Sequence, residues 1–282
     1  MNSESGFRSG ILRQRAALIL CAAIAFLAGG PAFGASPDAH KIMEDVYRQD
    51  TSRGTYMRAS FEVSDKEGHR TKKEFTYRRI GSPGDSKTLV VFTAPEEIRG
   101  VALLSINRRG VSDRQSMYIP ATQRVRPVAP QERSARFIVT DFTFEDIAER
   151  VLDDFSYRLL GETETIEGHK TWKVEATPAD SSRSQYKYIY YWVAQDVPVI
   201  LHAEMYDAQG REVRVLHASQ IKRVSGISGA RRTEMTSVLT GTKTVLVIDE
   251  VKFNANLDEK LFTPEELGQI HDSGTVSQSQ SH

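Results

Sequence analysis

Residues 186–221 read YKYIYYWVAQDVPVILHAEMYDAQGREVRVLHASQI, and this stretch decides the fold class. It contains three runs rich in aromatic, aliphatic and β-branched residues: Tyr186–Ala194, Val199–Tyr206 and Arg211–Ile221. The links between them, QDVP at 195–198 and DAQG at 207–210, are short and consist of turn-forming residues. Links this short cannot return the chain to the start of a parallel strand, so the three runs predict neighbouring antiparallel strands.

Runs of the same character continue on both sides of this stretch. From Met57 to Val63, and again around Phe75 and Tyr77, apolar and polar residues alternate, which is typical of strands with one buried face. Further strand candidates are Lys87–Thr93, Val101–Ile106, Gln115–Ile119, Gln123–Val128, Tyr157–Gly161, Thr171–Thr177, Arg231–Thr240 and Thr244–Phe253. Because long helical patterns do not alternate with the strands, the sequence predicts a mainly β protein with one large, twisted antiparallel sheet.

Helical patterns interrupt the strands at a few points. After Ser36-Pro37, apolar residues recur at helical spacing up to Tyr47 and predict a short amphipathic helix. Thr143 resembles a helix cap and precedes an apolar stripe within Phe144–Leu152. A fuller capping box, Thr263–Glu266, predicts a last helix near the C-terminus.

The N-terminus has the features of a secretory leader. Three arginines precede an apolar stretch, Ala16–Leu27, that is too short to span a bilayer. Small residues follow, and they predict cleavage after Gly34, with Ala35 as the alternative. We therefore expect a cleavable signal peptide at 1–34, a folded domain at 35–268, and a Ser/Gln-rich disordered tail at 269–282.

Composition and motifs exclude several function classes. The chain has 37 basic and 37 acidic residues, which does not give the strongly positive surface that nucleic-acid binding needs. Its one cysteine, Cys21, lies in the predicted leader, so we expect no disulfide in the mature chain. Hydrolase, metalloprotease and nucleotide-binding motifs are missing, and His202 and His217, which could meet across a hairpin, are weak metal candidates. We expect no catalytic residue, no metal and no cofactor.

The chain has more large apolar residues than one sheet face requires. Tyr186–Ala194 is apolar on both faces, so each side needs a cover, which a helix or a cavity could supply. A long sheet tends to curl, and methionines adapt to varied apolar ligands, so a lipid-binding hollow is one interpretation and a filled core is the other. The candidates for lining such a hollow are Met57, Phe61, Phe75, Tyr77, Met117, Phe142, Trp172, Tyr190, Trp192 and Met205.

Charged residues cluster in two neighbouring segments. Between Arg99 and Arg136 the sequence has eight arginines and two acids, which suggests a rim for anionic headgroups or for a partner, or else pairing with the acids that follow. The rim candidates are Arg99, Arg108, Arg109, Arg114, Arg124 and Arg126. We expect the following acids to form the solvated face of a helix. They are Asp141, Glu145, Asp146, Glu149, Asp153 and Asp154.

The order of several motifs resembles the periplasmic outer-membrane lipoprotein-sorting (LolA-like) family. These motifs are VFTAPEEIRGVALL at 91–104, MYIP at 117–120 and TDFTFED at 140–146. Later stretches fit the same order: YWV at 191–193, Pro198–Tyr206, DAQG at 207–210 and LFT at 261–263. The resemblance is to the branch associated with inner-membrane exporters of the resistance-nodulation-division (RND) type, and it covers nearly the whole mature chain.

The resemblance implies an incomplete, curved antiparallel half-barrel of about 11 strands, with two or three helices as a lid over an apolar cavity. It also implies a soluble periplasmic carrier for the acyl chains of a lipoprotein or lipid, with an RND-type exporter as partner and transient membrane contact. The alternative is an envelope-stress sensor of the same fold that binds lipid or peptide and an anti-sigma factor.

Overall fold

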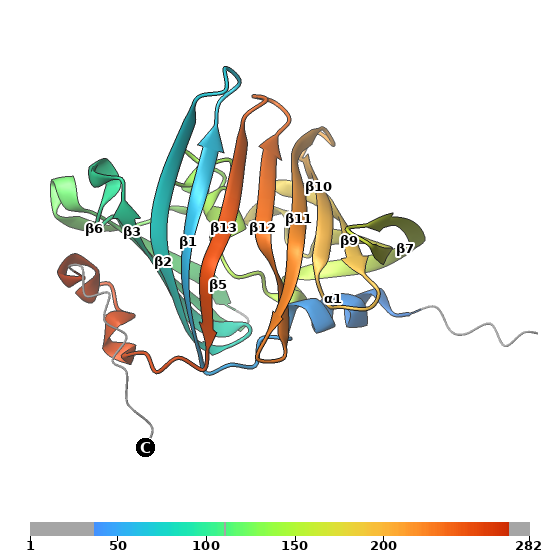
Figure 1. Cartoon of the computed structure of the whole chain (residues 1–282), viewed down its shortest axis with the longest axis horizontal. Coiled ribbons are helices and arrows are strands. Elements are labelled where there is room, and N and C mark those ends of the chain that lie inside the picture. Colours follow the sequence, from blue (N-terminus) through green and yellow to red (C-terminus); the bar gives the residue numbers. More distant parts are fainter. Residues whose placement is uncertain (1–36, 110, 271–282) are drawn as a thin grey trace, which may run out of the picture. The chain divides into compact units, whose positions relative to one another are not determined.

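The computed structural model describes residues 37–109 and 111–270 (Figure 1). The predicted leader and most of the predicted tail lie outside the described residues. Within these residues the strands are β1 (Gly54–Ser64), β2 (Arg70–Ser82), β3 (Asp85–Ala94), β4 (Ala102–Arg108), β5 (Val111–Ile119), β6 (Arg124–Pro127), β7 (Phe155–Ile166), β8 (His169–Pro178), β9 (Tyr186–Ala194), β10 (Ile200–Asp207), β11 (Glu212–Val224), β12 (Ile227–Ser237) and β13 (Lys243–Phe253). The helices are α1 (Ala39–Tyr47) and α2 (Phe144–Ile147), with short 3-10 turns at η1 (Glu96–Ile98), η2 (Pro120–Thr122), η3 (Pro130–Glu132), η4 (Phe137–Val139), η5 (Leu152–Asp154), η6 (Ser181–Arg183), η7 (Glu259–Leu261) and η8 (Glu266–Gln269).

All thirteen described strands belong to one antiparallel, unclosed and curved sheet. Its order is β6-β5-β4-β3-β2-β1-β13-β12-β11-β10-β9-β8-β7, so the first and last strands pair in the middle and β6 and β7 form the two edges. Phe61 of β1 lies opposite Leu246 of β13 in this central pair. The predicted single antiparallel sheet is confirmed. The count of about 11 strands that the resemblance implied was too low, whereas the strand candidates located in the sequence, Gln123–Val128 included, all form strands.

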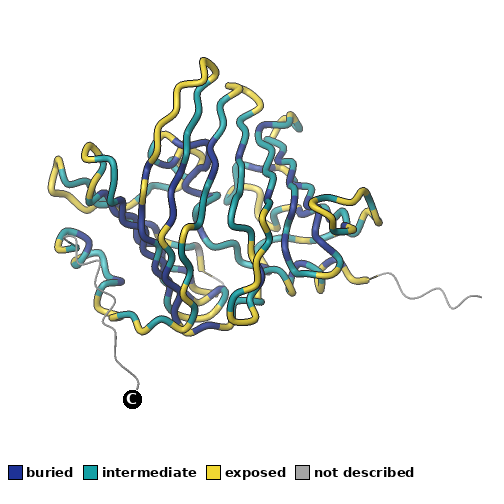
Figure 2. Tube along the Cα trace, in the orientation of Figure 1, coloured by how far each residue is buried: buried dark blue, intermediate teal, exposed yellow. Residues whose placement is uncertain are grey.

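The larger apolar core covers one face of the sheet, which we call the inner face. It combines alternate side chains of most strands with Ala39 and Met43 of α1. Helix α1 begins one residue after Asp38, whose carboxylate accepts a hydrogen bond from the His40 N–H at 3.0 Å. The cap is therefore Asp38, and the helix predicted after Ser36-Pro37 begins at Ala39. Figure 2 shows buried residues along the strands and exposed turns at their ends.

The opposite, outer face is covered over β3 to β5 by the C-terminal segment. Phe262 and Leu267 are fully enclosed there against Leu89 and Leu104. The capping box predicted at Thr263–Glu266 leads only to the short turn η8, because this stretch lies along the sheet as a strap. Across residues 37–109 and 111–270, no helix is long and apolar enough to cross a membrane.

A long connection, residues 128–154, joins the two edges of the sheet, and we call it the crossing segment. Because β6 and β7 are the opposite edges, this connection has to pass over a face of the sheet. It passes over the inner face, where Phe137, Phe142 and Phe144 are buried in the core. Its helix α2 has the predicted Thr143 cap but ends after one turn, because the backbone of Ala148 is extended.

A buried carboxylate fastens the crossing segment to β13. Asp141 is 1% exposed, and it accepts hydrogen bonds from the hydroxyls of Thr242 and Thr244, the latter at 2.7 Å. The Thr244 hydroxyl also accepts the Asp141 N–H at 2.9 Å, and Arg136 forms an ion pair with the carboxylate at 3.2 Å. A buried charge with this many partners holds the segment in one position.

We expect Asp141→Ala to lower the free energy of unfolding by about 3 kcal/mol, because it leaves Arg136, the buried Thr244 hydroxyl and the half-buried Thr242 hydroxyl without their acceptor. Chemical denaturation measures this loss. Asp153→Ala, at a side chain that is 70% exposed, is the control and changes stability by less than about 0.5 kcal/mol. Equal losses in the two variants would contradict the role of Asp141 as a fastening point.

Candidate functional site

Phenylalanine rings fill the space between the inner face and the crossing segment. Phe61 stacks on Phe75 with ring centroids 4.7 Å apart, and it meets Phe142 of the crossing segment at 5.4 Å. Phe137 lies 5.4 Å from Phe144 and 5.7 Å from Phe92. The interior is therefore closed by rings, and about half of these rings belong to the crossing segment rather than to the sheet.

Most of the predicted cavity residues lie in this interior. Tyr77 and Trp172 pack at the margin of the core, and Met57 is half-buried beside it. The others that the structure brings together are fully buried: Phe61, Phe75, Met117, Phe142 and Met205.

Tyr190 and Trp192 do not line the interior. Strand β9 alternates, and its core-facing residues are Ile189, Tyr191 and Val193, so Tyr190 and Trp192 lie on the outer face. There Lys173 stands over both rings, with its Nζ 4.7 Å and 4.0 Å from their centroids. Because the strand is apolar on both faces, its sequence could not tell which ring points inward.

An apolar groove of 240 Å³ opens beside the interior. Helix α1 contributes Val46 and Tyr47, and β1 contributes Met57. The opposite wall comes from the ends of β11, β12 and β13, with Val224, Ile227, Ile248, Val251 and Phe253. Lys222, Arg231 and Asp50 supply charge around it, so the groove has an apolar floor with polar groups at its border.

The crossing segment is strained where it passes the inner face. Ile138 and Val139 have φ angles of 45° and 58°, a left-handed conformation that β-branched residues rarely adopt. Such a residue costs about 1–3 kcal/mol, which the surrounding contacts have to offset. One such contact is the hydrogen bond from Lys73 Nζ to the Ile138 carbonyl at 2.9 Å. Burial lowers the pKa of the Lys73 ammonium.

The six rim candidates have different surroundings. Arg99 pairs with Glu96 at 2.8 Å and Arg126 with Glu132 at 2.8 Å. Arg109 lies near the Pro83 carbonyl at 3.5 Å. Arg114 and Arg124 are exposed, and Arg108 lines a pocket at the end of β4.

The acids of the crossing segment do not form one solvated helix face, so that prediction was wrong, although Asp153 is exposed. Glu145 is 8% exposed and accepts hydrogen bonds from the Ser184 hydroxyl at 2.6 Å and the Gln185 N–H at 2.9 Å. Glu149 accepts hydrogen bonds from the Ser86 hydroxyl and the Gly84 N–H, and it pairs with Arg79. The pattern of acids interleaved with apolar residues suited a helix face, but the helix stops at Ile147.

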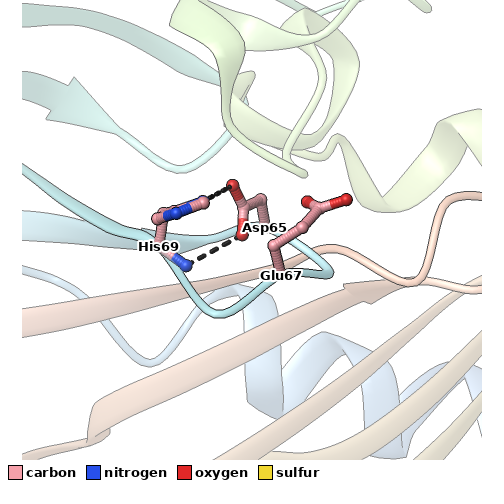
Figure 3. A group of neighbouring side chains, drawn as sticks. All are labelled: Asp65, Glu67 and His69. Carbon is pink, nitrogen blue, oxygen red and sulfur yellow. Dashed lines mark hydrogen bonds and ion pairs between the residues drawn. The ribbon is translucent and has the colours of Figure 1, made fainter.

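Three side chains at the tip of the β1–β2 hairpin have ligand atoms within 4.8 Å of one another: Asp65, Glu67 and His69 (Figure 3). Asp65 accepts hydrogen bonds from the His69 N–H at 2.8 Å and contacts its Nδ1 at 2.8 Å. These contacts close the turn, which accounts for the arrangement.

On the outer face, His202 and His217 do lie opposite each other, and His217 Nε2 is 3.1 Å from Glu167.

We expect Phe142→Ala to open space in the ring-filled interior beside Phe61 and to raise the affinity for a neutral apolar fluorophore such as N-phenyl-1-naphthylamine by about fivefold, because apolar cavities stay dry and accept apolar ligands. Fluorescence titration measures this change. Phe262→Ala is the matched control, since it removes an equally buried ring beneath the C-terminal strap on the outer face. Both variants lose about 3–5 kcal/mol of stability, so folding is checked by circular dichroism. Enhanced binding in both variants, or in neither, would contradict an inner site.

Comparisons with known proteins agree with this architecture. A family model of uncharacterised proteins matches residues 84–269, about two thirds of the chain. No curated protein matches the sequence.

Three solved structures share the fold. A Vibrio parahaemolyticus domain assigned to outer-membrane lipoprotein sorting has a TM-score of 0.76 at 22% identity, over 82% of this chain and 98% of its own. A DUF1329 family protein from Desulfovibrio piger has a TM-score of 0.77 at 25% identity, over 81% and 97%. A LolA superfamily protein from Nitrosomonas europaea has a TM-score of 0.66 at 21% identity, over 81% and 98%. The chain therefore belongs to this family of uncharacterised proteins, and its fold is that of the LolA-like structures.

Proposed function

We propose that this protein is a periplasmic carrier that holds the acyl chains of a lipid or lipoprotein against the inner face of the sheet. The observation that carries the proposal is an apolar inner face covered by a crossing segment that is strained and contributes its own rings to the core. A cover of this kind can be exchanged for hydrocarbon without unfolding the sheet. The LolA-like relatives support the same role.

The energetics of the exchange favour a chain of sufficient length. Each buried methylene contributes about 0.8 kcal/mol, so ten of them contribute about 8 kcal/mol. This gain has to offset the loss of the ring contacts made by Phe137, Phe142 and Phe144. The strain at Ile138 and Val139 reduces that loss, because displacement of the segment releases it. The groove beside Met57 is the proposed entrance.

The remaining parts of the proposal follow from the leader and from the family. Residues 1–34 act as a cleavable signal peptide, and the mature protein works in the periplasm of a Gram-negative cell without catalysing a reaction. An RND-type exporter in the inner membrane supplies or receives the cargo during transient membrane contact.

The proposal is tested on protein purified from its own periplasm. Native mass spectrometry followed by lipid extraction should reveal discrete acyl species bound at one per chain. Retention of no lipid, together with no uptake of added lipid, would rule out the carrier. Stable capture of an anti-sigma factor in place of lipid would instead favour the stress-sensor alternative.

We expect Met57→Gln to weaken the binding of a fluorescent fatty acid by about fivefold, because a polar amide in the groove opposes entry of hydrocarbon. Fluorescence titration measures the dissociation constant. Val125→Gln is the control at an exposed apolar residue of β6, outside the groove, and leaves binding unchanged. Equal affinities in the wild type and both variants would contradict the proposed entrance.

A further inference from the structure

A second pocket lies where the crossing segment ends, and it differs from the apolar groove in its chemistry. The end of β4, the start of β5, residues 145–155 and the β8–β9 connection enclose it. Its volume is 80 Å³, which is room for roughly six water-sized groups. It can therefore hold a small polar group but not an acyl chain.

Charges of both signs line this pocket in similar numbers. The basic residues are Arg108, Arg133, Arg150 and Arg183, and the acidic residues are Asp113, Glu145, Glu149, Asp154 and Asp180. Arg133 pairs with Asp113 at 2.6 Å, and Arg183 pairs with Asp154 at 3.4 Å. Among the described residues, no carboxylate lies within ion-pair distance of Arg108, which is exposed and leaves its guanidinium open to a ligand.

The wall of the pocket has donors and acceptors without partners. Among the described side chains, Arg133 Nε and Arg183 Nε are buried donors with no acceptor. Asn107 Oδ1 and Asp113 Oδ2 are buried acceptors with no donor. Unpartnered polar atoms are rare inside proteins, and their concentration around one pocket indicates that a polar group completes it. That group has to offer acceptors to the arginines and donors to the carboxylate and amide oxygens.

Part of the pocket lining is apolar and packs against the core of the inner face. Ala148, Val151 and Phe155 form this side, and Phe155 packs against the main core of the inner face. The Arg150 guanidinium lies over the Phe155 ring at 5.3 Å, so charge and hydrocarbon meet there. A ligand with a charged end and an apolar body matches this boundary.

We propose that this pocket binds the zwitterionic headgroup of the carried lipid, a phosphate ester that bears a primary ammonium group. The proposal rests on the proposed carrier function and names its lipid class. The phosphate oxygens accept hydrogen bonds from Arg108 and Arg183. The ammonium donates to the acidic and amide oxygens near Asp113 and Asn107. The balanced lining disfavours a purely anionic headgroup, and a quaternary ammonium cannot donate the hydrogen bonds.

Isothermal titration calorimetry tests this with dihexanoyl phosphatidylethanolamine, phosphatidylcholine and phosphatidylglycerol, each below its micelle concentration. The acyl chains are identical, so differences in affinity report the headgroup alone. We expect the wild type to bind the ethanolamine lipid about tenfold more tightly than the other two, the value of one charge-assisted hydrogen bond. Because the three lipids share the phosphate, Arg108→Gln and Arg183→Gln each weaken the binding of all three about tenfold.

Arg114→Gln is the matched control, since it removes an exposed arginine of β5 that does not line the pocket. It retains the wild-type affinities for all three lipids, and thermal unfolding verifies that all three variants are folded. Equal affinities of the wild type for the three lipids, or affinities that neither pocket variant lowers, would overturn the headgroup proposal while leaving the carrier intact. Binding of none of the three lipids would count against the carrier itself.

Discussion

The pairing of β1 with β13 in the middle of the sheet is the constraint on which the other features depend. It joins two meanders, β1–β6 and β7–β13, side by side, so the strands that are consecutive at the centre of the chain become the two outer edges. The connection between those edges then has to travel over the inner face. The strand order therefore makes the crossing segment the cover of the inner face.

The crossing segment is held by polar contacts at its margins and by rings at its middle. Asp141 fastens it to β13, Glu145 to the β8–β9 connection and Glu149 to the β2–β3 turn. Strain at Ile138 and Val139 works against these contacts. A cover with strong margins and a strained middle can yield locally, because the free energy of displacing its rings is smaller than that of separating it from the sheet.

Local patterns in the sequence were sufficient to predict where the strands lie and that neighbouring strands are antiparallel. Alternation located β1 and β2, and the turns at 195–198 and 207–210 made β9 to β11 antiparallel. The central pair is invisible to such patterns, because Phe61 and Leu246 are distant in the chain. The rings of β9 could not be assigned to a face, since both faces are apolar. The carboxylates at 141–149 looked solvated, because their buried partners, such as Thr244 and Ser86, lie in remote strands.

The filled interior is compatible with a carrier because of where its rings come from. Phe61, Phe75 and Phe92 belong to the sheet and stay in place, whereas Phe137, Phe142 and Phe144 belong to the segment that covers it. Hydrocarbon that enters beside Met57 would meet the sheet rings once the segment moves. The segment ends at the charged pocket, where Arg150 contacts Phe155. The acyl chains of a bound lipid would replace the apolar contacts that the crossing segment makes with the inner face. The headgroup of the same lipid would supply polar partners in the charged pocket. Both parts of the lipid would therefore favour the state in which the crossing segment is displaced from the sheet.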